Sequence, residues 1–288
     1  MTMFGVTMFP TDYAISPLEL ARAVEARGLD SLFFNEHSHI PTSRQTPFPG
    51  GGELPKHYWH TYDPFVAFGA AAAVTQRIRL GTGICLVVER DPIQLAKEVA
   101  SLDTLSNGRV ILGIGGGWNA EEMANHGTPF RQRWNVLRER VLAMREIWTK
   151  EAAEFHGEFV NFDPLWSWPK PIQTGGPKIL LGSKSKRGLE RVVEYCDGWM
   201  PLGGPGTETT LGEGVRELRT LCVRAGRRFE SLELAVIGLG PQEDTAQRLV
   251  ASGFQHIIFT LPPAGADQTL PILDTYANLA HKLGSKTA

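Results

Sequence analysis

The stretch of sequence that decides the fold is Arg109-Val110-Ile111-Leu112-Gly113-Ile114-Gly115-Gly116-Gly117-Trp118-Asn119-Ala120-Glu121-Glu122. Its first part is almost unbroken in apolar residues, as expected of a parallel strand covered on both faces. The glycines that follow have no Cβ, so the backbone can turn sharply or a ligand can approach closely. Asn119 is the predicted N-cap of a helix whose first turn carries two glutamates. A strand, a glycine turn and a helix start together predict a small-molecule site; a tight turn that binds nothing is the alternative.

The same strand-then-helix order recurs about eight times along the chain. The expected strands are residues 4–9, 31–35, 78–83, 110–114, 178–182, 198–202, 232–237 and 256–260. Helix starts are marked by Ser16-Pro17 and Asp91-Pro92, which place a cap before a proline. This alternation predicts a (β/α)₈ TIM barrel. The alternative is an open doubly wound sheet, whose dinucleotide fingerprint is missing from the end of the first strand.

Two segments interrupt the alternation. Residues 40–62 are rich in proline, glycine and aromatic residues and predict a long loop. Such loops in compact domains are usually functional, with plain surface packing as the alternative. Between the fourth and fifth strands, the sequence predicts an insertion at about residues 151–177, made of a hairpin and an extended loop. No low-complexity linker divides the chain, so residues 1–288 are expected to form a single domain.

Composition narrows the classes of partner. The chain has 288 residues, is 42% hydrophobic and 21% charged, and has a formal net charge of −2. Nothing in these values indicates nucleic acid or an anionic membrane as a partner. The three cysteines match no metal or redox spacing, so free thiols in a reducing cytoplasm are expected. No signal peptide or long apolar segment is visible, and we therefore expect a cytoplasmic enzyme acting on a small molecule.

Active sites of TIM barrels lie at the carboxyl ends of the strands, where four segments stand out. His37 follows the second strand, and residues 81–85, 115–119 and 182–187 follow the third, fourth and fifth. The last of these, named here the basic corner (residues 182–187), combines two hydroxyls with three cations at a helix start. That chemistry suits a phosphate, and the alternative is a solvated basic helix start.

His37 is the candidate for proton transfer because an imidazole titrates near neutral pH. The alternative is a histidine that only caps a loop. His37-Ser38-His39 also raises the question of a metal hydrolase, but the ends of the fifth and sixth strands offer no imidazole or carboxylate. The ligand set is incomplete, and no metal is expected.

Several short motifs occur together in an order typical of one enzyme family. They are Glu36-His37, Ile78-Arg79-Leu80-Gly81-Thr82-Gly83, Asp91-Pro92, Leu102-Asp103, Ser106-Asn107-Gly108-Arg109, Gly115-Gly116-Gly117-Trp118-Asn119-Ala120-Glu121-Glu122-Met123, Asn125-His126-Gly127, Pro169-Lys170-Pro171-Ile172-Gln173 and Asp197-Gly198-Trp199. With these residues the chain resembles the bacterial luciferase-like flavin/deazaflavin oxidoreductase superfamily, its F420-dependent branch in particular. The resemblance extends from the first strand to the sixth and is weaker after about Leu202.

The resemblance implies a place for each part of a cofactor. It implies a non-proline cis peptide at Gly83-Ile84 against the middle of the ring system, and an insertion beside the cofactor. It places His37 beside the reactive edge of the ring or beside the substrate. The residues implied to line the ring and its side chain are Gly117, Trp118 and Asn119, and those implied to hold the phosphate are Gly182, Ser183, Lys186 and Arg187. Barrels of this family often pair, so the resemblance also implies a homodimer.

The expected function is hydride transfer between coenzyme F420 and a small organic substrate, with His37 handling the accompanying proton. Phe48, Tyr58 and Trp59 are expected to cover the substrate. The first alternative keeps the fold but uses FMN and oxygen, as a monooxygenase; the second is a non-catalytic flavin-binding protein. One departure is notable: Trp118 stands where sugar-phosphate dehydrogenases of the family have a glutamate proton donor. The acid is therefore unassigned, and a sugar phosphate is not the expected substrate.

Overall fold

The structure is a computed structural model that describes residues 2–286, and its centre is a closed barrel of parallel strands. The strands are β1 (Met3–Met8), β2 (Ser31–Phe34), β3 (Arg79–Thr82), β4 (Val110–Ile114), β7 (Lys178–Leu181), β8 (Gly198–Trp199), β9 (Glu233–Leu239) and β10 (His256–Thr260). They pair in the order β1-β10-β9-β8-β7-β4-β3-β2, and β2 pairs again with β1. The predicted TIM barrel is thereby confirmed.

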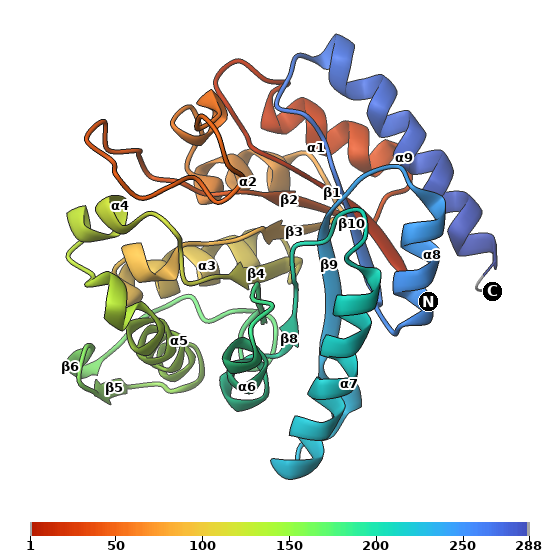
Figure 1. Ribbon diagram of the computed structural model, residues 1–288. Coiled ribbons are helices and arrows are strands. Elements are labelled where there is room, and N and C mark those ends of the chain that lie inside the picture. The colour runs from red at the N-terminus through yellow and green to blue at the C-terminus, as the bar shows by residue number, and fades with distance from the viewer. Residues whose placement is uncertain (1, 287–288) are drawn as a thin grey trace.

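Helices surround the barrel (Figure 1). They are α1 (Pro17–Ala26), α2 (Pro64–Ala73), α3 (Pro92–Leu105), α4 (Ala120–Asn125), α5 (Arg133–Thr149), α6 (Lys186–Tyr195), α7 (Glu208–Arg224), α8 (Glu243–Ala251) and α9 (Ala266–Lys286), with 3₁₀ turns η1 (Lys56–Tyr58), η2 (Val87–Glu89), η3 (Phe130–Gln132) and η4 (Phe229–Ser231). The predicted caps form: the Ser16 hydroxyl accepts from the Glu19 amide at 3.2 Å, and Asp91 accepts from the Gln94 amide at 2.8 Å. No helix within residues 2–286 is both long and apolar enough to cross a membrane.

The barrel interior is filled with apolar side chains rather than open. They are Phe33, Ile111, Leu180, Met200, Ala235, Ile237 and Ile258, with the half-buried Ile84 packed against them. Gly81 in β3 and Gly83 directly after it make room for this layer. A Cβ on Gly81 would lie 2.2 Å from Cε1 of Phe33, and one on Gly83 would lie 2.3 Å from Cδ1 of Ile237. Any side chain there would displace the core.

The predicted insertion forms a hairpin of β5 (Ala153–His156) and β6 (Asn161–Leu165). A single carboxylate on α5, Glu139, accepts hydrogen bonds of 2.7 to 3.0 Å from three successive amides at the hairpin turn. Further along, the Lys170 ammonium donates to the carbonyl of Ile147, and the Gln173 amide donates to Asp103 on α3. These contacts pack the insertion against the outer helices α3 and α5.

One predicted strand is much shorter than expected. The sixth strand was expected over residues 198–202, but β8 contains only Gly198 and Trp199. Pro201 has no amide hydrogen to donate, so the regular ladder is interrupted there, although its carbonyl accepts from the Ile237 amide at 3.1 Å. Leu202 then makes one isolated bridge to Ile237 of β9, so the barrel stays closed although the strand is short.

Candidate active site

The segments named from sequence meet at the carboxyl ends of the strands. The Asn35 side chain donates a 2.7 Å hydrogen bond to the carbonyl of Gly83, joining the ends of β2 and β3. The Gly83–Ile84 peptide is cis, as the resemblance implied. Ile84 also lies against two other strand ends, because a Cβ on Gly115 or Gly182 would come within 2.9 and 3.1 Å of its side chain. Four strand ends therefore surround Ile84.

His37 is fixed by a buried hydrogen bond to a carboxylate. Its Nδ1 lies 2.7 Å from Oε2 of Glu122, and the two side chains are 7% and 0% exposed. The other oxygen of Glu122 accepts from the Ser38 amide at 3.1 Å. Because a carboxylate oxygen accepts, Nδ1–H of His37 donates to Glu122, and Nε2 is the ring nitrogen that Glu122 does not bind.

The start of α4 differs from its sequence-based interpretation. Asn119 occupies the N-cap position, but its side chain makes no capping bond. Instead its amide Nδ2 donates to Glu122 at 3.4 Å, and its Oδ1 is buried without a partner among residues 2–286. A helix-dipole role was predicted for Glu121 and Glu122. That prediction is incomplete, because both side chains bind the loop that follows β2.

A second carboxyl lies next to Glu122. Glu89 on η2 is buried and hydrogen-bonded to Glu122. Burial, with the nearby charges of Glu122 and Glu36, raises the pKa of Glu89 to about 9. The raised pKa favours the neutral form of Glu89 at pH 7. The carboxyl of Glu89, the carboxylate of Glu122 and the imidazole of His37 thus lie next to one another in that order.

Replacing Glu89 with Gln should make the free energy of unfolding less dependent on pH. The folded-state pKa lies above the ordinary value of 4.5, so the folded protein keeps a proton that the unfolded chain loses. Stability contributed by this proton is complete below 4.5 and is lost as the pH rises toward 9, with a maximal slope of about 1.4 kcal/mol per pH unit. We expect Glu89→Gln to be increasingly more stable than the wild type as the pH rises, measured by urea unfolding at several pH values. A difference independent of pH would show that Glu89 is ionised in the fold.

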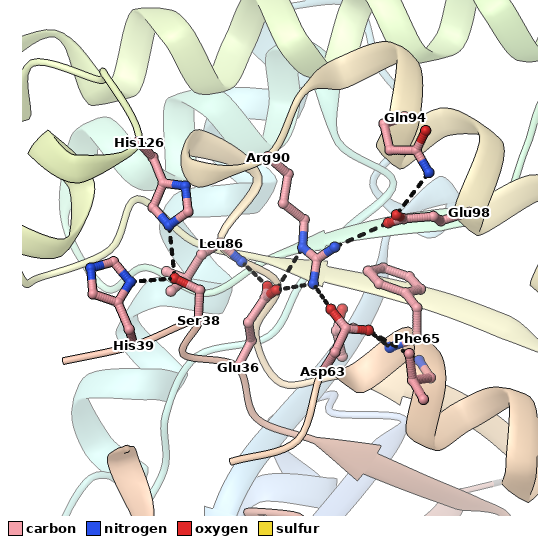
Figure 2. Close-up of polar contacts among 12 residues, drawn as sticks. Glu36, Ser38, His39, Asp63, Phe65, Leu86, Arg90, Gln94, Glu98 and His126 are labelled. Carbon is pink, nitrogen blue, oxygen red and sulfur yellow. Dashed lines mark hydrogen bonds and ion pairs between the residues drawn. The ribbon is translucent and has the colours of Figure 1, made fainter. Parts of the chain in front are cut away.

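Glu36, the residue before His37, belongs to a separate ion-pair network (Figure 2). Nε of Arg90 donates to Glu36 at 2.6 Å, and its Nη1 and Nη2 bind Glu98 and Asp63. Glu36 also accepts from the Leu86 amide at 2.6 Å. Asp63 caps α2 and Glu98 lies on α3. Arg90 therefore connects the end of β2 to two helices and fixes the backbone that carries His37.

Ser38 and two histidines form a small cluster at the surface (Figure 2). The Ser38 hydroxyl lies 2.9 Å from Nδ1 of His39 and 2.7 Å from Nε2 of His126. The other ring nitrogen of His39 bonds to the Asn125 side chain at 2.8 Å. Across residues 2–286, no three histidine, cysteine, aspartate or glutamate side chains are grouped so as to hold a metal ion. The cluster ties α4 to the segment after β2.

Aromatic residues from the 40–62 loop surround His37. The Tyr58 ring centroid lies 5.0 Å from that of His37, and the Trp118 centroid lies 5.9 Å from it. Phe48 contacts both Tyr58 and Trp118, at 5.3 and 6.0 Å. Trp59 does not join them; it contacts His60 and is 49% exposed. Of the three aromatic residues expected to cover the substrate, Phe48 and Tyr58 lie in the cluster around His37, and Trp59 does not.

Glu121 anchors this loop. Its Oε1 accepts from the amides of Gln45 and Thr46 at 3.0 and 3.1 Å. The hydrogen bond from the Thr46 hydroxyl, with these amides, lowers the pKa of Glu121 to about 2. The anchor therefore remains charged throughout the neutral pH range.

A row resembling a hydrolase triad occurs at the opposite end of the barrel. The Ser31 hydroxyl lies 2.7 Å from Nε2 of His256, but Nδ1 of His256 is 3.7 Å from Glu233, too far for a hydrogen bond. Ser31 and His256 are fully buried, and a Cβ on Gly5 would lie 1.8 Å from the serine oxygen. A substrate has no access to this serine, so the row serves packing at the amino ends of the strands.

Comparison of the sequence with known protein families shows which family the chain belongs to. Residues 12–285 match the family model of luciferase-like monooxygenases. The chain belongs to this family. An uncharacterized protein of Mycobacterium tuberculosis is 38% identical over 278 residues, which cover 95% of this chain and 97% of the relative.

Two solved structures of the same fold have names that state different chemistry. The monooxygenase RslO1 from Streptomyces bottropensis has a TM-score of 0.77 and 20% identity, over 99% of this chain and 100% of that one. The coenzyme F420-dependent tetrahydromethanopterin reductase from Methanopyrus kandleri has a TM-score of 0.74 and 16% identity, over 96% and 97%. At these identities the likeness concerns the fold.

The site of this luciferase-like chain contains residues that the sequence analysis did not assign. They are the carboxyls of Glu36, Glu89 and Glu122 and the guanidinium of Arg90. Glu36 and Glu89 each follow an apolar run, at the ends of segments 31–34 and 86–88, where a charge indicates a buried partner. Glu122 has no comparable signal, because its partner His37 lies 85 residues away in the chain.

Proposed function

We propose that this luciferase-like protein is an F420-dependent oxidoreductase that moves a hydride between the deazaflavin and a small organic substrate. The observation that carries the proposal is the buried His37–Glu122 pair beneath Tyr58 and Trp118, at the strand ends that also lead into the basic corner. The deazaflavin, when bound, supplies or takes up the hydride. The proton that accompanies it needs a group of this chain.

His37 is the group proposed to carry that proton. Because Nδ1 is tied to Glu122, Nε2 can donate to or accept from the substrate. The Glu122 carboxylate stabilises the imidazolium that forms when Nε2 takes a proton. Neutral Glu89 behind Glu122 can share its proton with that carboxylate. Phe48 and Tyr58 exclude water from the same place.

The basic corner fits the phosphate of such a cofactor. Ser185 caps α6 by accepting from the Gly188 amide at 3.0 Å, and its hydroxyl lies 3.2 Å from that of Ser183. Lys184, Lys186 and Arg187 are exposed and form no ion pair within residues 2–286. We propose that Gly182, Ser183, Lys186 and Arg187 hold the phosphate, and that Gly83, Ile84, Gly117, Trp118 and Asn119 contact the ring and its side chain.

An FMN-dependent monooxygenase is the second candidate, and the family description favours it. Titrating the purified protein with F420 and with FMN, followed by fluorescence, separates the two. We expect F420 to bind at least tenfold more tightly, a difference of about 1.4 kcal/mol. Binding of FMN alone, with oxygen consumption once the flavin is reduced, would replace the proposal by the second candidate. Binding without turnover of any enone, quinone or ketone would favour a non-catalytic flavin-binding protein.

We also propose that the protein is a cytoplasmic homodimer, as its resemblance to paired barrels of the family suggests. Light scattering coupled to size exclusion should give a mass near twice the 31.7 kDa of one chain. A mass of one chain at micromolar concentration would contradict the dimer.

A further inference from the structure

Two arginines lie on one tryptophan beside the glycine run. Cζ of Arg191 on α6 is 4.6 Å from the centroid of the Trp134 ring, and Cζ of Arg133 is 5.6 Å from it. The ring itself lies against the glycine run, since a Cβ on Gly116 would come within 2.8 Å of it. Both guanidinium groups are thereby held at the Trp134 ring, next to the turn after β4, and Arg133 also lies over Phe130 at 3.8 Å.

The charge of this pair is not neutralised by the protein. Neither Arg133 nor Arg191 forms an ion pair within residues 2–286, whereas Arg90 and Arg145 each bind a carboxylate there. Arg133 donates from Nη1 to the carbonyl of Phe130 at 2.8 Å, and its Nε is buried without a partner. Burial and the neighbouring charge of Arg191 lower the pKa of Arg133. Two like charges kept together without a counter-ion are a ready site for an anion.

The pair continues the basic corner. Arg191 follows Arg187 by four residues on α6, so both side chains lie on one face of that helix. The start of α6 is fixed next to the barrel, because Nε1 of Trp199 donates to the carbonyl of Ser183 at 2.6 Å. Cations thus extend from the corner, along α6, to the edge of the glycine run. No carboxylate is bonded to them in the part of the chain that the structure describes.

We propose that Arg133 and Arg191 form an anion subsite that binds the acidic arm of the cofactor. The inference rests on the proposed function and deepens it. A flavin nucleotide brings one phosphate, whereas F420 brings a phosphate followed by glutamyl carboxylates. Guanidinium groups bind both kinds of anion through paired N–H donors. Cations beyond the basic corner therefore favour the cofactor with the longer acidic arm.

The test measures dissociation constants, not turnover. Arg133→Met, Arg191→Met and the double variant are titrated with three deazaflavins: one with phosphate and glutamates, one with phosphate only, and the riboflavin-like precursor with neither. We expect each substitution to weaken the first by about tenfold, the worth of a hydrogen bond between charged groups, and to leave the precursor unchanged. The loss should diminish at high salt.

The arms of the experiment identify the anion. A loss confined to the glutamylated form assigns the subsite to carboxylates, and an equal loss with phosphate alone assigns it to the phosphate; both support the inference. Arg219→Met is the matched control, because Arg219 on α7 lies over a different ring, that of Phe229 at 3.9 Å, and does not contact Trp134. Unchanged affinity in the double variant, or equal weakening of the neutral precursor, would overturn the inference.

Failure of the proposed function gives a different pattern. If the wild type binds FMN and no deazaflavin, the same variants are compared with FMN and riboflavin. Weakening of FMN but not of riboflavin then supports the subsite while rejecting F420. If the wild type binds none of these molecules, the subsite and the proposed function both fail.

Discussion

His37→Ala is expected to lower kcat by about 10²–10⁴-fold while changing the affinity for the cofactor less than threefold. The reason is that the imidazole, oriented by Glu122, is the group placed to exchange a proton with the substrate. The measurement follows oxidation of reduced F420 with the first substrate on which the wild type turns over.

Two further variants separate the chemistry from the packing. His37→Asn retains a donor toward Glu122 but has no titratable nitrogen, so it should remain folded and be as slow as the alanine variant. His60→Ala removes a partly exposed histidine of the same loop, which pairs with Asp12 and contacts the rings of Tyr13 and Trp59 but not His37, and should leave kcat within about twofold. If His37→Asn turned over at the wild-type rate, the proton role of His37 would be wrong.

Arg90→Met is expected to lower the free energy of unfolding by about 3 kcal/mol. The substitution leaves Glu36, which is 3% exposed, without the cation that its carboxylate binds. It also releases Asp63 and Glu98, so the start of α2 and the side of α3 lose a common partner. Denaturant unfolding followed by circular dichroism measures the change.

Arg138→Met is the matched control for this prediction. Arg138 binds Glu194 at 2.6 Å, but both side chains are nearly half exposed, so its loss should cost less than about 1 kcal/mol. Equal destabilisation by the two substitutions would mean that burial adds nothing to the Arg90 network.

The fold was predictable because it depends on signals that are local in the sequence. The caps at Ser16 and Asp91 have the predicted bonds, and the alternation of strands and helices closes into the predicted barrel. The length of the sixth strand was overestimated because the apolar run was followed through Pro201, a residue that lacks the amide hydrogen of a regular ladder.

The site was predictable only in part, because its bonds join residues far apart in the chain. His37 and the glycine run could be found from their places after strands. Glu122 could not be assigned, since the same residue type at the same place also suits a helix dipole. Likewise Trp59 differs from Tyr58 only in the direction that its side chain takes after η1.

The adjacent glutamates at the start of α4 bind different partners. Glu121 accepts hydrogen bonds from the backbone of the 40–62 loop, and Glu122 is hydrogen-bonded to the imidazole of His37. One short helix thus holds two separate parts of the site, the loop that carries Phe48 and Tyr58 and the ring of His37. A substitution that displaces the start of α4 would disturb both parts together.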